Sequence, residues 1–250
     1  MVILKKKKII IGLLILLIIL YLIFKTFCLY YYDPSRFISG NYDNESKNFR
    51  NNNKVITIKK SNEIVSNYLE NDSMKIKNIF TNFSKKVSTN EKNENIDIYA
   101  LNNDKNNTAI YFGSITSYRD SFNNNINSSL GSFKYLKINT KKILKKYNIK
   151  DDIDLVKLAM EFKDKKVNFF TSVDKIKTIY ALKMFSLSFP TSSNGISFID
   201  GDYNGFYIDT DRIKEYIIIK NNKIYVISFY NKDYYSQDTI NNILETMVLK

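Results

Sequence analysis

The sequence predicts an α+β protein in which an N-terminal transmembrane helix is followed by an antiparallel sheet covered by helices. Three observations lead to this class. Residues 9–24 form a run of sixteen residues without a charge. Residues 196–229 consist of apolar, strand-like segments separated by polar turns, and residues 240–247 carry apolar side chains at the spacing of one helix face. Strands and helices that occupy separate stretches of the chain are typical of the α+β class.

The apolar run has unequal positive charge on its two sides. At about 1.5 Å per residue it spans roughly 24 Å, and the flanking Lys25 and tyrosines 30–32 extend it toward the roughly 30 Å of a hydrocarbon core. Lysines 5–8 precede the run, whereas only Lys25 and Arg36 follow it closely. The positive-inside rule therefore predicts a single-pass cell-membrane protein with a cytoplasmic N-terminus and an extracytoplasmic C-terminal domain.

The residues after the run decide between an anchor and a cleaved signal. No small-residue cleavage pattern is present, and Phe27 before Cys28 does not suit lipid attachment at that cysteine. An uncleaved signal anchor is therefore expected, with cleavage or lipidation at Cys28 as the alternatives. The expected organisation is a cytoplasmic lysine tail and transmembrane anchor over 1–32, a polar tether over 33–54, and an extracytoplasmic α+β domain over 55–250.

The domain is expected to contain helices, a first hairpin, more helices and a closing β-meander. A short strand is expected at 55–58, and apolar spacing predicts helices over 64–69 and 76–87. Alternation predicts a hairpin over 96–112, and residues 123–129 are interpreted as a loop or frayed helix. Helices are expected after 140, from 151 and from 173. A hairpin through Asn221-Asn222 and a final helix capped by Ser236 complete the domain.

Composition excludes several classes of function. The chain has no histidine and one cysteine among its 250 residues, which excludes Ser-His-Asp and Cys-His catalysis and thiolate zinc sites. The formal net charge is +13, but only four of the 38 basic residues are arginine, the side chain best suited to phosphates and base edges. Because lysine, asparagine, isoleucine and tyrosine also abound, AT-rich coding explains the charge. Nucleic acid is not an expected partner.

The C-terminal segment resembles a known fold family. The hairpin 216–229 followed by the helix 240–247 is similar to the closing hairpin and helix of PsbP-like α/β proteins. The whole chain also resembles single-pass membrane-anchored proteins of AT-rich, low-GC bacteria. The resemblance implies a sheet covered by helices and a binding or accessory role, and it brings no catalytic residue with it.

The stretch from residue 200 to 205 matches the first half of a calcium-binding loop, D-x-D-x-N-G. Asp200, Asp202 and Asn204 occupy positions 1, 3 and 5, and Asp211 occupies position 12, which gives the oxygen ligands that calcium needs. Position 12 is normally Glu, and the flanks are strands rather than helices. A β-turn with positive φ at Gly205 is therefore the preferred interpretation, and calcium is the alternative and the sole cofactor considered.

Two further patterns allow a catalytic hypothesis. Ser172 and Lys175 match S-x-x-K at a helix start, but the companion S-D-N and K-T-G motifs are missing, so capping explains Ser172. Asp151/Asp152 and Asp209/Asp211 are carboxylate pairs at cap and turn positions. The expected function is thus non-enzymatic binding or assembly in the cell envelope. Its expected partners are the lipid bilayer, through the N-terminal helix, and either anionic envelope polymers or another envelope protein. An extracytoplasmic hydrolase using these carboxylates or the Ser-Lys pair is the alternative.

Overall fold

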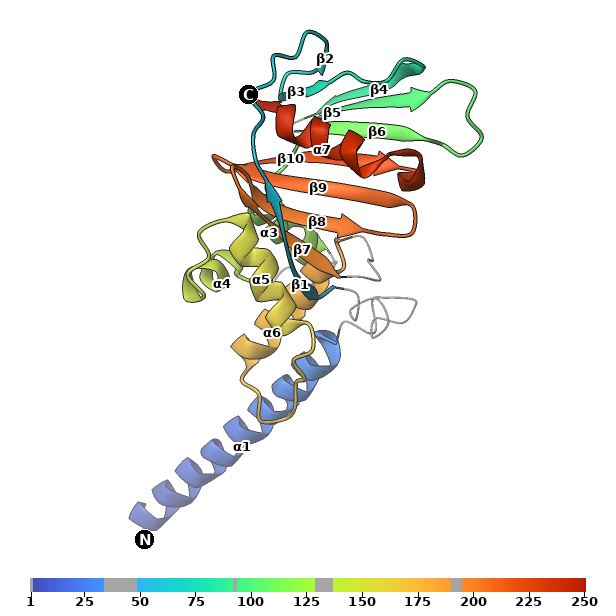
Figure 1. Ribbon diagram of the computed structural model, residues 1–250. Helices are drawn as coiled ribbons and strands as arrows, with labels where there is room; N and C mark the ends of the chain where they lie inside the picture. Colours follow the sequence, from blue (N-terminus) through green and yellow to red (C-terminus); the bar gives the residue numbers. More distant parts are fainter. Residues whose placement is uncertain (1, 34–48, 92–93, 129–136, 190–194) are drawn as a thin grey trace.

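A computed structural model describes residues 2–33, 49–91, 94–128, 137–189 and 195–250, and it has the predicted α+β architecture. The helix α1 (Val2–Tyr31) projects from one side of a domain built around a large sheet (Figure 1). The other helices are α3 (Tyr118–Ser128), α4 (Thr140–Lys146), α5 (Asp152–Phe162), α6 (Val173–Ser186), the 3₁₀ turn η3 (Lys232–Tyr234) and α7 (Gln237–Thr246).

The large sheet has eight strands in the order β1-β7-β8-β9-β10-β6-β5-β4. All neighbours are antiparallel except β1 and β7, which run parallel, so the sheet is mixed rather than purely antiparallel. The strands are β1 (Asn51–Ile58), β4 (Phe83–Glu91), β5 (Glu94–Leu101), β6 (Ala109–Ile115), β7 (Ile196–Gly201), β8 (Asn204–Asp209), β9 (Ile213–Lys220) and β10 (Lys223–Tyr230).

The predicted closing meander is confirmed in detail. The hairpin between β9 and β10 turns through Asn221 and Asn222, whose φ angles of 52° and 61° are the left-handed values that asparagine tolerates. Ser236 caps α7, because its hydroxyl accepts a hydrogen bond from the amide of Thr239. The apolar face of α7 is buried, as its spacing indicates.

The sheet buries a different layer on each face. One core holds α3–α6, the C-terminal end of α1 and alternate sheet residues that include Phe206 and Ile217. The opposite core holds α7 and a small sheet, together with the intervening sheet residues such as Ile218 and Ile227. The small sheet has the order β11-β3-β2, formed by β2 (Tyr68–Glu70), β3 (Met74–Lys77) and β11 (Val248–Leu249). Successive residues along β9 and β10 point to opposite faces of the sheet, so each strand contributes side chains to both cores.

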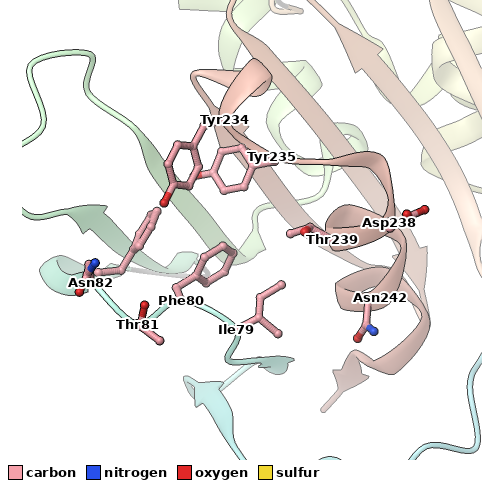
Figure 2. Close-up of a pocket in the computed structure, with 10 residues that line it drawn as sticks. Ile79, Phe80, Thr81, Asn82, Tyr234, Tyr235, Asp238, Thr239 and Asn242 are labelled. Carbon is pink, nitrogen blue, oxygen red and sulfur yellow. The ribbon is translucent and has the colours of Figure 1, made fainter.

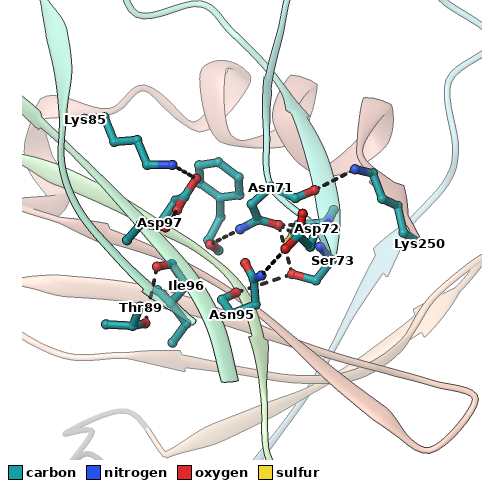
Figure 3. Close-up of polar contacts among 12 residues, drawn as sticks. Asn71, Asp72, Ser73, Lys85, Thr89, Asn95, Ile96, Asp97 and Lys250 are labelled. Carbon is teal, nitrogen blue, oxygen red and sulfur yellow. Dashed lines mark hydrogen bonds and ion pairs between the residues drawn. The ribbon is translucent and has the colours of Figure 1, made fainter. Parts of the chain in front are cut away.

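A polar network attaches the small sheet to the large one (Figure 3). The Asn71 side chain closes the β2–β3 turn by accepting from the amide of Met74, and it donates to the carbonyl of Phe112 in β6. Nearby, the carboxylate of Asp97 is fully buried and accepts hydrogen bonds from Lys85 Nζ and Ser88 Oγ, each at 2.6 Å. These contacts satisfy buried polar groups that the sheet alone would leave without partners.

Three predicted elements differ from the structure. Residues 64–69 and 76–87 do not form helices, because these stretches contain β2, part of β3 and the first half of β4. Their apolar residues fit a helical spacing, but the runs are short, and pairing with neighbouring strands sets the conformation of residues 68–69, 76–77 and 83–87. The first strand begins at Asn51 rather than at Val55, within the stretch expected to be a tether. Most of that tether, residues 34–48, lies outside the described residues.

The α1 helix has two parts with different surroundings. From Ile9 to Phe24 every side chain is exposed, whereas Lys25, Cys28 and Tyr32 form a buried stripe toward the domain. The Tyr32 ring meets Tyr180 of α6 edge-on, with ring centroids 5.4 Å apart. The segment Ile9–Tyr31 is long and apolar enough to cross a membrane. A hydrophobic helix that is exposed on all sides over its first part suits an apolar solvent there.

Candidate functional site

A hollow lined by aromatic side chains lies between α7, η3 and the loop that leads into β4 (Figure 2). Its volume is about 540 Å³, the size of a small-molecule site. The 79–83 loop forms one wall, and η3 with the first two turns of α7 forms the other. The lining residues are Ile79, Phe80, Thr81, Asn82, Phe83, Tyr234, Tyr235, Asp238, Thr239 and Asn242.

Four rings form a continuous cluster at this hollow. Phe80 packs against Phe83 with centroids 4.7 Å apart and meets Tyr235 edge-on at 5.9 Å. Tyr234 meets Tyr235 edge-on at 5.2 Å, and Phe83 lies 6.0 Å from Tyr234. The Tyr235 ring also packs edge-on against Phe229 of β10, with ring centroids 5.1 Å apart. These separations are typical of favourable ring pairs, so the cluster is a defined platform.

Two buried polar atoms of the lining residues lack hydrogen-bond partners. Tyr235 is 4 % exposed, and its hydroxyl has no partner among the described residues. The same holds for Asn242 Oδ1 in α7. Burial raises the pKa of Tyr235, so the phenol remains a hydrogen-bond donor throughout the physiological range. A buried donor and a buried acceptor without partners cost free energy.

The charge of the hollow limits the ligands it suits. None of the ten described lining residues is Lys or Arg, in a chain with 38 basic residues, and Asp238 is the one acid among them. A phosphate or polyanion would find no cation here. Aromatic faces beside a donor and an acceptor instead suit a neutral molecule with both an apolar face and hydroxyl or amide groups.

The structure does not bring the four predicted calcium ligands together. Asp200, Asp202 and Asn204 lie at the β7–β8 turn, whereas Asp211 lies in the β8–β9 turn at the other end of β8. A six-residue strand separates the two turns by about 20 Å, far beyond the reach of one cation shell. Among the described residues, no three Asp, Glu, Cys or His side chains form a group that could hold a metal ion.

Asp200, Asp202 and Tyr203 of this turn instead have structural contacts. Asp202 accepts a hydrogen bond from the amide of Lys60 at 2.8 Å, and Asp200 accepts one from the amide of Gly201 at 2.8 Å. The buried Tyr203 hydroxyl donates to the carbonyl of Met247 at 3.0 Å. The expectation of positive φ at Gly205 is wrong. Gly201 has φ of +110°, whereas Gly205 lies in β8 and is required by close packing against β9.

The S-x-x-K motif forms a helix cap. Ser172 Oγ accepts a hydrogen bond from the amide of Lys175 at the start of α6, as a capping serine does. Asp209 forms an ion pair with Lys232 at 2.7 Å, on the strand end that precedes Asp211. These contacts match the structural interpretations of the S-x-x-K motif and of the Asp209/Asp211 pair.

The Asp151/Asp152 pair connects α3 and α5. Asp151 caps α5 by accepting from the amide of Asp154 at 2.8 Å. The fully buried Asp152 accepts from Ser117 Oγ at 2.9 Å and from the amide of Arg119 at 2.8 Å, at the start of α3. Burial raises the pKa of Asp152, and these hydrogen bonds oppose the shift. Its carboxylate therefore holds the N-terminal ends of α3 and α5 together.

Comparisons with protein-family models, with curated proteins and with solved structures find no match to this chain. The candidate site therefore depends on its own geometry.

Proposed function

We propose that this chain is a single-pass membrane-anchored binding protein whose aromatic hollow holds a neutral saccharide unit of an envelope polymer. The observation that carries the proposal is the pairing of an aromatic platform with the unpartnered Tyr235 hydroxyl and Asn242 Oδ1. A sugar ring offers an apolar face of C–H groups to Phe80 or Tyr234. Its hydroxyls both donate and accept, so a sugar that displaced the local packing could pair with the Tyr235 hydroxyl or with Asn242 Oδ1.

A cationic amine is the main competing ligand, because aromatic rings with a carboxylate also attract quaternary ammonium groups. A quaternary ammonium group has no lone pair for the Tyr235 hydroxyl and no donor for Asn242 Oδ1. The two unpartnered atoms therefore favour the saccharide. The lack of Lys and Arg among the lining residues also favours it over the anionic polymers considered from the sequence.

The membrane anchor and its orientation are supported by sequence and burial. The segment Ile9–Tyr31 has the length and hydropathy of a span, and lysines 5–8 precede it. We infer that the N-terminus is cytoplasmic and the domain extracytoplasmic. Protease added to intact spheroplasts should remove a C-terminal tag, and a tag that stays protected until lysis would reverse the orientation.

The binding test uses the full chain in lipid nanodiscs, since maltoside or choline detergents carry groups that would compete. Titration calorimetry with β-1,4-linked N-acetylglucosamine tetramer, maltotetraose and tetramethylammonium compares the ligand classes. Binding of at least one saccharide, and weaker or no binding of tetramethylammonium, is expected. Failure of both saccharides to bind would contradict the proposal.

Variants locate the binding to the hollow. Tyr235→Phe removes one hydroxyl and should weaken saccharide binding about tenfold, the effect of one lost hydrogen bond. The same variant should leave the melting temperature of the free protein unchanged or higher, because the hydroxyl has no partner. Tyr234→Ala should also weaken binding, whereas Phe170→Ala, at an exposed ring outside the hollow, should not. Equal binding by all three variants would exclude this site.

A further inference from the structure

The loop between α5 and α6 presents two phenylalanines beside α1. Phe169 is 43 % exposed and Phe170 is 90 % exposed. Lys25 of α1 lies over the Phe169 ring at 5.0 Å from its centroid and over the Tyr21 ring at 5.8 Å. Figure 1 shows this loop running alongside the C-terminal half of α1. The tip of the loop is therefore at the level of Tyr21 and Lys25.

The tip has a defined hydrogen-bonded shape. The Asn168 side chain accepts from the amide of Phe170 at 3.0 Å, and the Asn168 amide donates to Thr171 Oγ1 at 3.0 Å. The Thr171 amide in turn donates to the Asn168 carbonyl at 3.0 Å. This closed turn directs the Phe170 ring outward, where burial in the domain is impossible. Lys165 and Lys166 are exposed on the same loop.

The length of α1 sets the depth in the membrane of the tip of the α5–α6 loop. The fully exposed apolar part, Ile9–Phe24, spans roughly 24 Å, short of a hydrocarbon core of about 30 Å. With Ile9 at one boundary of the core, the other boundary lies about 20 residues along the helix, near Cys28. Lys25 is thus within the outermost layer of the core, and so is the Phe169 ring that contacts it. On this side of α1 the buried Cys28 faces protein rather than lipid.

We propose that Phe169 and Phe170 form a membrane foot, which inserts both rings into the interfacial layer of the leaflet that α1 leaves. The foot rests on the proposed membrane anchoring of α1. Its occupant is the lipid bilayer: aromatic rings partition to the interface, and the exposed Lys165 and Lys166 on the same loop suit anionic headgroups. The domain then contacts the bilayer at two points, α1 and the foot, and its tilt is fixed.

The chain contains no tryptophan, so single-tryptophan variants report depth without background. Phe170→Trp tests the foot, Leu17→Trp tests the span, and Tyr234→Trp is the control at an exposed ring of the aromatic hollow. The full chain is placed in phosphatidylcholine–phosphatidylglycerol vesicles that contain lipids with a quencher either near the headgroup or deep in the acyl chain. Tryptophan emission is compared with and without each quencher.

Each pattern of quenching has one meaning. We expect Leu17→Trp to be quenched by the deep lipid, Phe170→Trp by the shallow lipid with blue-shifted emission, and Tyr234→Trp by neither. Unquenched, solvent-like emission from Phe170→Trp beside a quenched Leu17→Trp overturns the foot and leaves the anchoring intact. An unquenched Leu17→Trp overturns the anchoring and the foot with it.

Discussion

Replacing Gly205 with alanine should be one of the most damaging small substitutions in the domain. A Cβ at this position would lie 1.9 Å from the carbonyl oxygen of Ile217, whereas ordinary contact begins near 3.4 Å. The backbones of β8 and β9 must therefore separate by about 1.5 Å at this point, the difference between those distances. The shift weakens the pairing of Gly205 with Ile218 and opens the contact between the fully buried Phe206 and Ile217.

The expected cost is about 3 kcal/mol. Overpacking of a core typically costs about 1–3 kcal/mol, and each weakened backbone hydrogen bond adds about 1 kcal/mol. For a chain of this size that corresponds to a fall of about 6–12 °C in melting temperature. Asp200→Ala, in the adjoining turn, removes one exposed hydrogen bond to the Gly201 amide and should cost less than about 1 kcal/mol.

Thermal unfolding of the full chain in nanodiscs, followed by circular dichroism, measures both variants. Gly12→Ala is the matched control, since a Cβ there meets no atom within 4 Å. If Gly205→Ala melts within about 2 °C of the parent protein, β8 and β9 do not approach each other as closely as described, and the steric reasoning fails.

Two further predictions concern the carboxyl groups of Glu215 and Asp97. Burial raises the pKa of Glu215, against a hydrogen bond from Ser228, so the folded state loses stability as pH rises from about 4.3 through the raised pKa. Glu215→Gln should remove this loss, and a melting-temperature profile between pH 4 and 8 that parallels the parent protein would contradict it. The hydrogen bond to Asp97 raises the pKa of Lys85. The protonated lysine therefore stabilises the folded state below about pH 10.4, and this stabilisation is lost above that pH. Lys85→Ala should cost about 1 kcal/mol at pH 7 in urea unfolding, because the lysine is half exposed, and the difference should shrink above about pH 11.

The elements predicted correctly from sequence are those whose signals agree at several levels. The β9–β10 hairpin combines alternating apolar residues with an Asn-Asn turn, and α7 combines a capping serine with a single apolar face. The helices from Asp151 and from Ser172 likewise begin at the predicted caps. Local propensity, pattern and tertiary burial all favour the same structure there.

The errors arose where pattern and burial disagree. Residues 76–87 place Ile76, Phe80 and Phe83 at helical intervals, but β3 pairs with both β2 and β11, and β4 pairs with β5. The β11 partner of β3 lies about 175 residues further along the chain, so no local spacing reveals it. Tertiary pairing overrode a short periodic signal.

The same misassignment concealed the aromatic hollow. As part of a helix, Phe80 and Phe83 would be core residues, with no relation to Tyr234 and Tyr235. Only the strand arrangement brings the 79–83 loop against η3 and α7. Adjacent tyrosines just before a capped helix were the available signal, but the unpartnered atoms that define the ligand chemistry become visible only with the packing known.

The positions of the anchor, the foot and the hollow have one mechanical consequence. Tyr32 and Tyr180 join α1 directly to α6, so the domain is packed on the helix rather than connected through the 34–48 segment alone. The helix α7, which lines the aromatic hollow, lies at the end of the domain remote from the N-terminus of α1 (Figure 1). The proposed foot would block rotation of the domain about the end of α1 and would hold the hollow facing away from the bilayer. A domain held in this way by α1 and the foot would bind ligands at only one distance from the membrane. Such a restriction suits a polymer that lies over the membrane surface.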